Sequence, residues 1–514
     1  MKILKINLID VPHRPLLNGL LLEFVDPDAN KNILPNILIG INGSGKSQLL
    51  ETIAEIFLYL DRLYRKINRT PVAPIPVLFE LVYLINFKRK DILVTVKQIV
   101  SSSKKPEITA TDIEGRDFNF SADDINDLLP YKVIGYTSGD NETLSLPFTD
   151  YYDEYAKYTG GRALVGKNKD LKDYDPRFYL MDYNTNIGVL ISNLILGDET
   201  LVNELVNHVG IKSLKSFQLT IQTNHPAAPS KDGVKLTAEL KNWIMQLCHS
   251  ATCYEFNEKD NKYILDFFIN KETKNAIKYF FKTSIDFYTA LYKIELLNNL
   301  IIKDEQLKEI KKQRSIRKLI IKPPTVPEQD KVLSYSEVKL NLLSGDTVNY
   351  INLSDGEHQY LNIFGTVLMT NFPNCIYLLD EPETHFNPKW RREFISILTH
   401  IAKGRKQDYF ITSHSPFIVA DSKREQVFIF KRTESNSLDI KSPTEETYGS
   451  DSDFILKIAF ELDSSLAKNS YDEIKILSQS DDAELIEEKI NEFGDSAEKL
   501  YLFKRLEELK SKTK

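Results

Sequence analysis

A glycine-rich loop that ends in lysine and serine is the most specific chemical signal in the sequence. The stretch GINGSGKS, residues 40–47, matches the pattern Gly-x-x-x-x-Gly-Lys-Ser and lies between a strand-like run and a helix-like run. Such glycines let backbone N–H groups wrap phosphate oxygens. Lys46 is expected to reach the β- and γ-phosphates of ATP, and the Ser47 hydroxyl to hold Mg²⁺. The expected nucleotide-binding residues here are Gly40, Asn42, Gly43, Ser44, Gly45, Lys46 and Ser47.

Two adjacent carboxylates end a second apolar run, CIYLLDEPE, residues 375–383. Asp380 is suited to support Mg²⁺, and Glu381 to act as the catalytic base that orients an attacking water. Burying acids at the end of a strand costs free energy unless a metal or hydrogen bonds compensate them. The alternative interpretation is an ordinary polar strand end. In FITSHSP, His414 follows a further strand, so we predict that it contacts the γ-phosphate; a structural histidine is the alternative.

The polar stretch LSDGEHQ, residues 353–359, precedes the buried helix expected at LNIFGTVLM. The free N–H groups of a helix N-terminus attract anions, and Ser354 could add a hydroxyl donor. A helix cap is the alternative, because Ser or Asp followed three residues later by Glu or Gln is a common helix start.

The composition is that of an ordinary globular protein. The 514 residues are 42% hydrophobic and 27% charged, and the net charge of −7 argues against an overall basic coat for nucleic acid. The three cysteines form neither a disulfide framework nor a zinc set. No signal peptide is visible, and the longest apolar stretch, residues 77–87, is too short to cross a bilayer. We therefore expect a cytoplasmic protein without a membrane partner.

Strand–helix alternation in both end regions predicts one α/β domain assembled from both ends of the chain. The predicted parts are an N-terminal lobe (1–150), a mainly helical insertion (151–330), a C-terminal lobe (331–435) and a helical tail (436–514). Within them, 151–177 reads as a loop, 283–318 as one long helix, and 101–117 as a polar interval rich in turns.

In this order, GINGSGKS, LSDGEHQ, IYLLDEPE and FITSHS resemble the Walker A, signature, Walker B and H-loop motifs of ABC-type ATPases. The similar subgroup includes structural-maintenance-of-chromosomes proteins, RecF and OLD-type ATPases. Together with YTSGDNETLSLPF and TYGSDSDFILKIAFEL, the motifs most resemble the antiphage ATPase subunits of Septu (PtuA-type) and retron systems. The resemblance implies an ATPase head of mixed sheet and flanking helices, with ATP and Mg²⁺ as cofactors.

The resemblance also implies partners. In this superfamily the signature of one copy caps the nucleotide held by another, so Ser354 and Gly356 should face a γ-phosphate in a head-to-head dimer. Asp355 and Glu357 depart from the common LSGGQ, which puts the hydrolysis rate in doubt. Asn387 falls where the D-loop, which contacts the second copy, would lie, and Asn141 is a candidate for contacting Mg²⁺. A separate HNH-type nuclease is the implied partner of PtuA-like proteins.

Two further stretches could bear on nucleic acid. KKQRSIRK, residues 311–318, could contact the phosphate backbone of DNA or RNA, or could be the solvated end of a helix. Asp451 and Asp453 have the spacing of a nuclease metal pair, but helix capping explains them better, so we predict no nuclease activity in this chain. The alternatives to an antiphage ATPase are a DNA-repair ATPase of RecF or chromosome-maintenance type and a non-hydrolysing scaffold that senses ATP.

Overall fold

The computed structural model has an α/β fold with mixed sheets and flanking helices, as predicted. It describes residues 1–24, 35–65, 72, 74–100, 105–138, 144–165, 174–225, 228, 233–302, 305–306, 309, 326–434, 437–460, 462 and 464–512. The basic stretch 311–318 and Asn141 lie outside these residues. No helix within the described ranges is long and apolar enough to cross a membrane.

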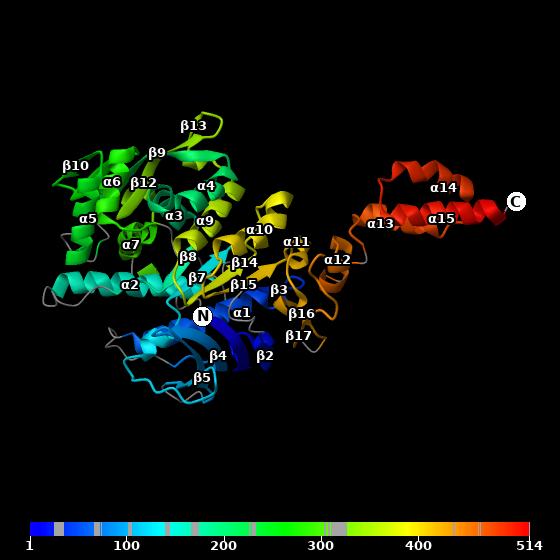
Figure 1. Cartoon of the computed structure of the whole chain (residues 1–514), viewed down its shortest axis with the longest axis horizontal. Coiled ribbons are helices and arrows are strands. Elements are labelled where there is room, and N and C mark those ends of the chain that lie inside the picture. Colours follow the sequence, from blue (N-terminus) through cyan, green and yellow to red (C-terminus); the bar gives the residue numbers. More distant parts are fainter. Residues whose placement is uncertain are drawn as a thin grey trace.

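A seven-stranded sheet at the centre of the molecule draws its strands from both ends of the chain, as predicted (Figure 1). All neighbouring strands are parallel except β16 and β17, which form an antiparallel pair at one edge of the sheet. Burial on both faces explains why its central strands are continuous apolar runs. In spatial order the strands are β17 (Leu438–Lys441), β16 (Val427–Arg432), β3 (Asn36–Ile39), β15 (Gln407–Ser413), β14 (Cys375–Asp380), β7 (Lys132–Thr137) and β8 (Phe178–Met181).

An antiparallel sheet lies next to the N-terminus in Figure 1. Its order is β2 (Leu20–Glu23), β1 (Lys2–Asp10), β4 (Leu78–Phe87), β5 (Lys90–Gln98) and β6 (Glu107–Asp112). The prediction of a turn-rich interval at 101–117 was wrong at β6, where pairing with β5 overrides the weak local pattern. The buried Asp408 joins this sheet to the central one, because it accepts hydrogen bonds from Lys2 Nζ and Ile3 N, both at 2.8 Å.

A third sheet belongs largely to the insertion. Its order is β10 (Cys253–Asn257), β11 (Lys262–Phe268), β9 (Ile211–Gln222), β12 (Leu333–Leu342) and β13 (Thr347–Asn349). The insertion also contains the helices α3 (Tyr183–Leu196), α4 (Glu199–Asn207), α5 (Ala238–Ser250), α6 (Lys271–Phe280) and α7 (Ser284–Glu295). The sequence did not predict β9–β11. Sheet membership also crosses the expected boundaries, since β8 lies in the central sheet and β12 and β13 in this one.

Two predictions of local structure were wrong. Residues 151–165 of the predicted loop instead continue the helix α2 (Ser145–Val165), in which Tyr151 and Tyr155 are buried, and residues 166–173 lie outside the described ones. The helix expected at 283–318 is interrupted, because α7 ends at Glu295 and gives way to a 3₁₀ turn, η3 (Leu296–Ile301), and most of 303–318 lies outside the described residues. There Asn298 Oδ1 accepts a hydrogen bond from Val332 N at 2.7 Å, which anchors the chain entering β12.

The C-terminal tail is helical, as predicted, and its last part stands apart from the rest in Figure 1. After α12 (Ser452–Phe460), the helices α13 (Lys468–Ser478), α14 (Ala483–Lys489) and α15 (Ala497–Lys512) enclose a separate apolar core. Asp451 Oδ1 accepts a hydrogen bond from Phe454 N at 2.8 Å, so the capping interpretation of this aspartate is confirmed.

Candidate nucleotide-binding site

The phosphate loop connects β3 to the helix α1 (Lys46–Tyr64). Gly40 has φ +144°, and a Cβ there would lie 2.3 Å from the carbonyl oxygen of Phe430, so only glycine fits. Lys46 Nζ donates to the carbonyl oxygens of Gly40 at 2.8 Å and Ile41 at 3.2 Å. Burial lowers the pKa of Lys46 to about 8, against the opposing effect of nearby carboxylates. The ammonium group is thus held beside the concave loop that would receive phosphates.

Ser47 and Asp380 are brought together, as a shared magnesium site requires. Asp380 Oδ1 accepts hydrogen bonds from Ser47 Oγ at 2.8 Å and from Thr412 Oγ1 at 2.5 Å. Thr412 is placed by strand pairing, because it lies opposite Asp380 in the parallel ladder of β14 and β15. Burial raises the pKa of Asp380. A hydroxyl and a carboxylate are the oxygen donors that Mg²⁺ prefers, so this pair fits the ion.

Glu381 and His414 face each other just beyond the ends of β14 and β15. Glu381 Oε1 lies 3.4 Å from His414 Nε2, and this close approach of the His414 ring lowers the pKa of the Glu381 carboxyl. Both side chains are about one-third exposed, at 38% and 31%, although the His414 Nε2 atom itself is buried. Glu381 has φ +49°, and its backbone N–H donates to the Thr412 side chain at 3.0 Å. A backbone conformation that is unfavourable for glutamate is therefore held by the neighbouring strand.

Glu383 lies beneath this pair and was not predicted from the sequence. It is 4% exposed, and its Oε1 accepts hydrogen bonds from Ser413 Oγ and, at 3.3 Å, from His414 N. Its Oε2 is buried and has no hydrogen-bond partner among the described residues. Burial raises the pKa of this carboxyl. Glu383 therefore fixes the backbone that carries His414; a second acid two residues after Glu381 is the signal that could have identified it.

The signature stretch begins helix α9 (Asp355–Met369) with a complete capping box. Ser354 Oγ accepts from Glu357 N at 3.4 Å, and the Glu357 carboxylate accepts from Ser354 N at 2.7 Å. The helix-cap interpretation is therefore confirmed. Ser354 and Asp355 are exposed, so the end of the helix is accessible to a second molecule.

The same helix is joined to the turn that follows Glu381. Gln359 Nε2 donates to Pro382 O at 2.6 Å, and Gln359 Oε1 accepts from His385 N at 3.2 Å. Gly356 packs so closely that a Cβ there would lie 2.7 Å from His385 O. The start of α9 and the turn after β14 thus form one connected unit within a single chain.

Two other predicted positions are less informative. Asn387 caps helix α10 (Pro388–Ile401), with its Oδ1 accepting from Trp390 N at 2.9 Å. Asn141 lies outside the described residues, but Ser138, at the end of β7, hydrogen-bonds Thr384 at 3.1 Å. Ser138, the last described residue before Asn141, therefore lies beside the Glu381 turn.

Two solved structures are similar to this chain at low sequence identity. The SMC head domain from Thermotoga maritima is 10% identical, with 87% of this chain and 100% of that chain covered and a TM-score of 0.33. An SMC head bound to the C-winged helix domain of ScpA is also 10% identical, with 86% and 98% covered and a TM-score of 0.34. Neither likeness bears on what this chain binds. Comparison with curated proteins gives no match.

A family model gives the more specific result. Residues 252–420 match the family described as "AAA domain, putative AbiEii toxin, Type IV TA system". The matched residues include the signature helix, Asp380, Glu381 and His414, whereas the phosphate loop precedes them. This part of the chain is therefore similar to an AAA domain.

Proposed function

We propose that the chain binds and hydrolyses ATP. The observation that carries this proposal is the convergence of Lys46, the Ser47–Asp380 pair and the Glu381–His414 pair at the carboxyl ends of β3, β14 and β15. The carboxyl ends of parallel strands are where α/β proteins bind ligands. A purely structural role does not explain why two carboxylates, a lysine and a histidine gather at one such edge.

Each side chain has a role in this proposal. Lys46 binds the β- and γ-phosphates, while Ser47 and Asp380 hold Mg²⁺, which supplies positive charge where negative charge develops. Glu381, kept ionised by its depressed pKa, orients a water molecule and accepts its proton. His414 contacts a γ-phosphate oxygen and keeps the water in line.

We further propose that two copies associate head to head around ATP. The exposed helix N-terminus at Ser354 supports this, since the positive end of the α9 dipole suits an anion presented by another molecule. The close packing of Gly356 on His385 keeps the cap in fixed relation to the chain's own catalytic turn. A second copy is the partner whose bound γ-phosphate the cap would complete.

The biological setting that we propose is regulation of a separate HNH-type nuclease in antiphage defence. The motif resemblance to Septu and retron ATPases supports it, and so does the tail. Large apolar side chains are exposed on the tail helices although these already have their own core: Ile476, Leu485, Leu500, Tyr501 and Phe503. Such a surface is typical of a docking site for another protein.

Glu381→Gln tests the enzymatic part. The amide keeps the shape of the side chain but cannot accept a proton, so phosphate release should fall at least a hundredfold while ATP binding and dimers persist. Phosphate release and light scattering on the same preparation measure both. The hydrolysis proposal fails if the wild-type protein releases no phosphate even with DNA and the partner present, and a non-hydrolysing ATP sensor would then remain.

A further inference from the structure

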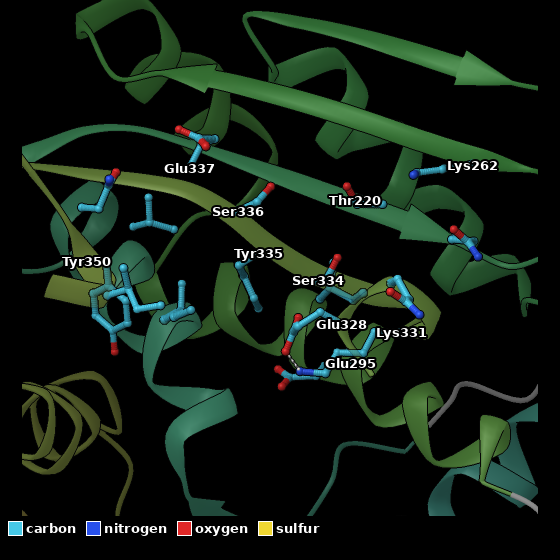
Figure 2. Close-up of a pocket in the computed structure, with 17 residues that line it drawn as sticks. Thr220, Lys262, Glu295, Glu328, Lys331, Ser334, Tyr335, Ser336, Glu337 and Tyr350 are labelled. Atoms are coloured by element: carbon cyan, nitrogen blue, oxygen red, sulfur yellow. Dashed lines mark hydrogen bonds and ion pairs between the residues drawn. The ribbon is translucent and has the colours of Figure 1, made fainter. Parts of the chain in front are cut away.

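The insertion contains a cavity of about 750 Å³ along β12, and this cavity is separate from the nucleotide site (Figure 2). The described residues that line it do not include Lys46, Asp380 or Glu381. Its polar lining is divided, because Ser334 and Tyr335 are neighbours in β12 and therefore point to opposite faces of the strand. The feature that bears on catalysis is instead a side chain from the first helix of the tail.

Phe460, the last residue of α12, lies beside the ring of His414. The two ring centroids are 5.8 Å apart, and the ring planes are tilted by 32° to each other. This separation is within the range over which aromatic side chains attract one another. Phe460 is also partly buried against the main apolar core. A residue of the predicted tail therefore reaches the Glu381–His414 pair.

The chain that enters α12 is hydrogen-bonded to the chain that leaves the catalytic histidine. The helix α11 (Pro416–Ala420) begins two residues after His414, and Gly449 N donates to the carbonyl oxygen of the last residue of α11 at 2.8 Å. Helix α12 then packs against α11, and its residues Ile455 and Ala459 belong to the main apolar core. Helix α12 is thus part of the head, which explains how its last residue is held beside the nucleotide site.

The orientation of the His414 ring is not fixed by the hydrogen bond from its backbone N–H to Glu383. The imidazole of a histidine can still turn about its two side-chain torsions. Glu381 Oε1 approaches Nε2 at 3.4 Å, and Phe460 lies beside the ring. A phenyl group carries no charge and no hydrogen-bonding atom, so it acts on the imidazole by packing alone. Phe460 therefore restricts rotation of the ring without taking part in proton transfer.

We propose that Phe460 is a positioning residue for His414 and that its ring keeps the imidazole directed at Glu381 and at the bound γ-phosphate. The inference rests on the proposed ATPase function, because a fixed imidazole is useful for holding the attacking water in line. Its structural half is the contact that orients His414, and this half can be tested without ATP hydrolysis.

Three variants of the full-length protein test the kinetic half. Phe460→Ala should lower kcat about tenfold while the Kd for ATP changes less than about twofold, because only the orientation of His414 is lost. Phe460→Tyr keeps the ring and should restore kcat to within about twofold of the parent rate. Phe454→Ala is the matched control, because Phe454 lies in the same helix and is also partly buried against the main core. This control should leave kcat within about twofold of the parent rate.

NMR of the histidine rings tests the structural half. In protein labelled at histidine, the His414 signal is assigned by its loss in His414→Asn. Because an aromatic ring shifts the resonances of protons beside it, the His414 signal should move in Phe460→Ala by more than any other histidine signal. It should stay in place in Phe454→Ala. These spectra need no ATP, so they decide the structural half even for a protein that never hydrolyses ATP.

The outcomes distinguish this inference from the proposed function. An unmoved His414 signal in Phe460→Ala would show that the two rings do not interact, and the inference would be wrong. A moved signal with unchanged kcat would overturn the positioning role and leave ATP hydrolysis intact. Equal losses of kcat in Phe460→Ala and Phe454→Ala would also overturn it, because the effect would then belong to the packing of α12 as a whole. If the wild-type protein releases no phosphate, the proposed function fails, while a moved signal still supports the contact.

Discussion

At the scale of single residues, the proposed role of Lys46 predicts that ATP binding is sensitive to pH. Its ammonium group is buried beside the carbonyl oxygens of its own loop, and its pKa is lowered to about 8. Phosphates would favour the charged form, so binding is strongest below pH 8 and weakens as pH rises above it. Between about pH 7 and pH 9 we expect the Kd for ATP to increase up to about tenfold. Isothermal titration in buffers of different ionisation enthalpy should show proton uptake on binding, and its absence would contradict this role.

Two substitutions at Glu383 separate the hydrogen bonds that its side chain accepts from the charge that it carries. Glu383→Gln keeps an oxygen that can accept from Ser413 and His414, whereas Glu383→Ala leaves both donors without their partner. We expect kcat to fall roughly tenfold or more in the alanine variant, with the Kd for ATP nearly unchanged, and to recover largely in the glutamine variant. Steady-state kinetics with parallel ATP titrations measure the split. Equal losses in both variants would show that the charge of Glu383 matters instead.

At the scale of elements, the contact between the signature helix and the catalytic turn depends on the lack of a side chain at Gly356. In Gly356→Ala the new Cβ would meet the backbone of His385 at 2.7 Å, so α9 must shift. We expect a loss of stability of about 1–3 kcal/mol, together with reduced hydrolysis. Thermal denaturation measures the first. The control is Gly161→Ala in α2, where nothing lies within 4 Å of the added Cβ and where alanine should be neutral or slightly stabilising.

The elements also show what local sequence could and could not predict. The strand–loop–helix around Lys46 and the strand ends at Asp380 and Ser413 were predictable, since each motif has its own flanking pattern. Strand β9 was missed because its partner β12 lies far along the chain, and pairing at that range leaves a weak local signal. Strands β10 and β11 pair with each other as a local hairpin, so long-range pairing does not explain why they were missed. Helix α2 was missed because its tyrosines are buried by contacts with other parts of the chain, which the local sequence does not reveal. Glu383 was missed because its partners lie on another strand.

At the scale of the whole molecule, the tail and the head have separate apolar cores, so their functions should be separable. Replacing Leu500 and Tyr501 with serine removes two side chains that are each 63% exposed, so folding should change little. We expect the ATPase rate to stay within about twofold, while binding of the partner nuclease falls at least tenfold. Co-purification with the partner and the ATPase rate measure the two effects. A matched loss of ATPase activity would show instead that the tail supports the head.

The central claim is that one copy's Ser354 completes the nucleotide site of another, and mixing two variants tests it most directly. Lys46→Ala removes the phosphate contact, and Ser354→Asp keeps a helix cap while placing a negative charge before the γ-phosphate. Each variant alone should be inactive. If the sites form between copies, a mixed dimer contains one intact site, so mixing the two inactive proteins in equal amounts should restore about a quarter of the wild-type ATPase rate under random exchange of copies. If exchange of copies between dimers is verified and ATPase activity still does not recover, the account is contradicted.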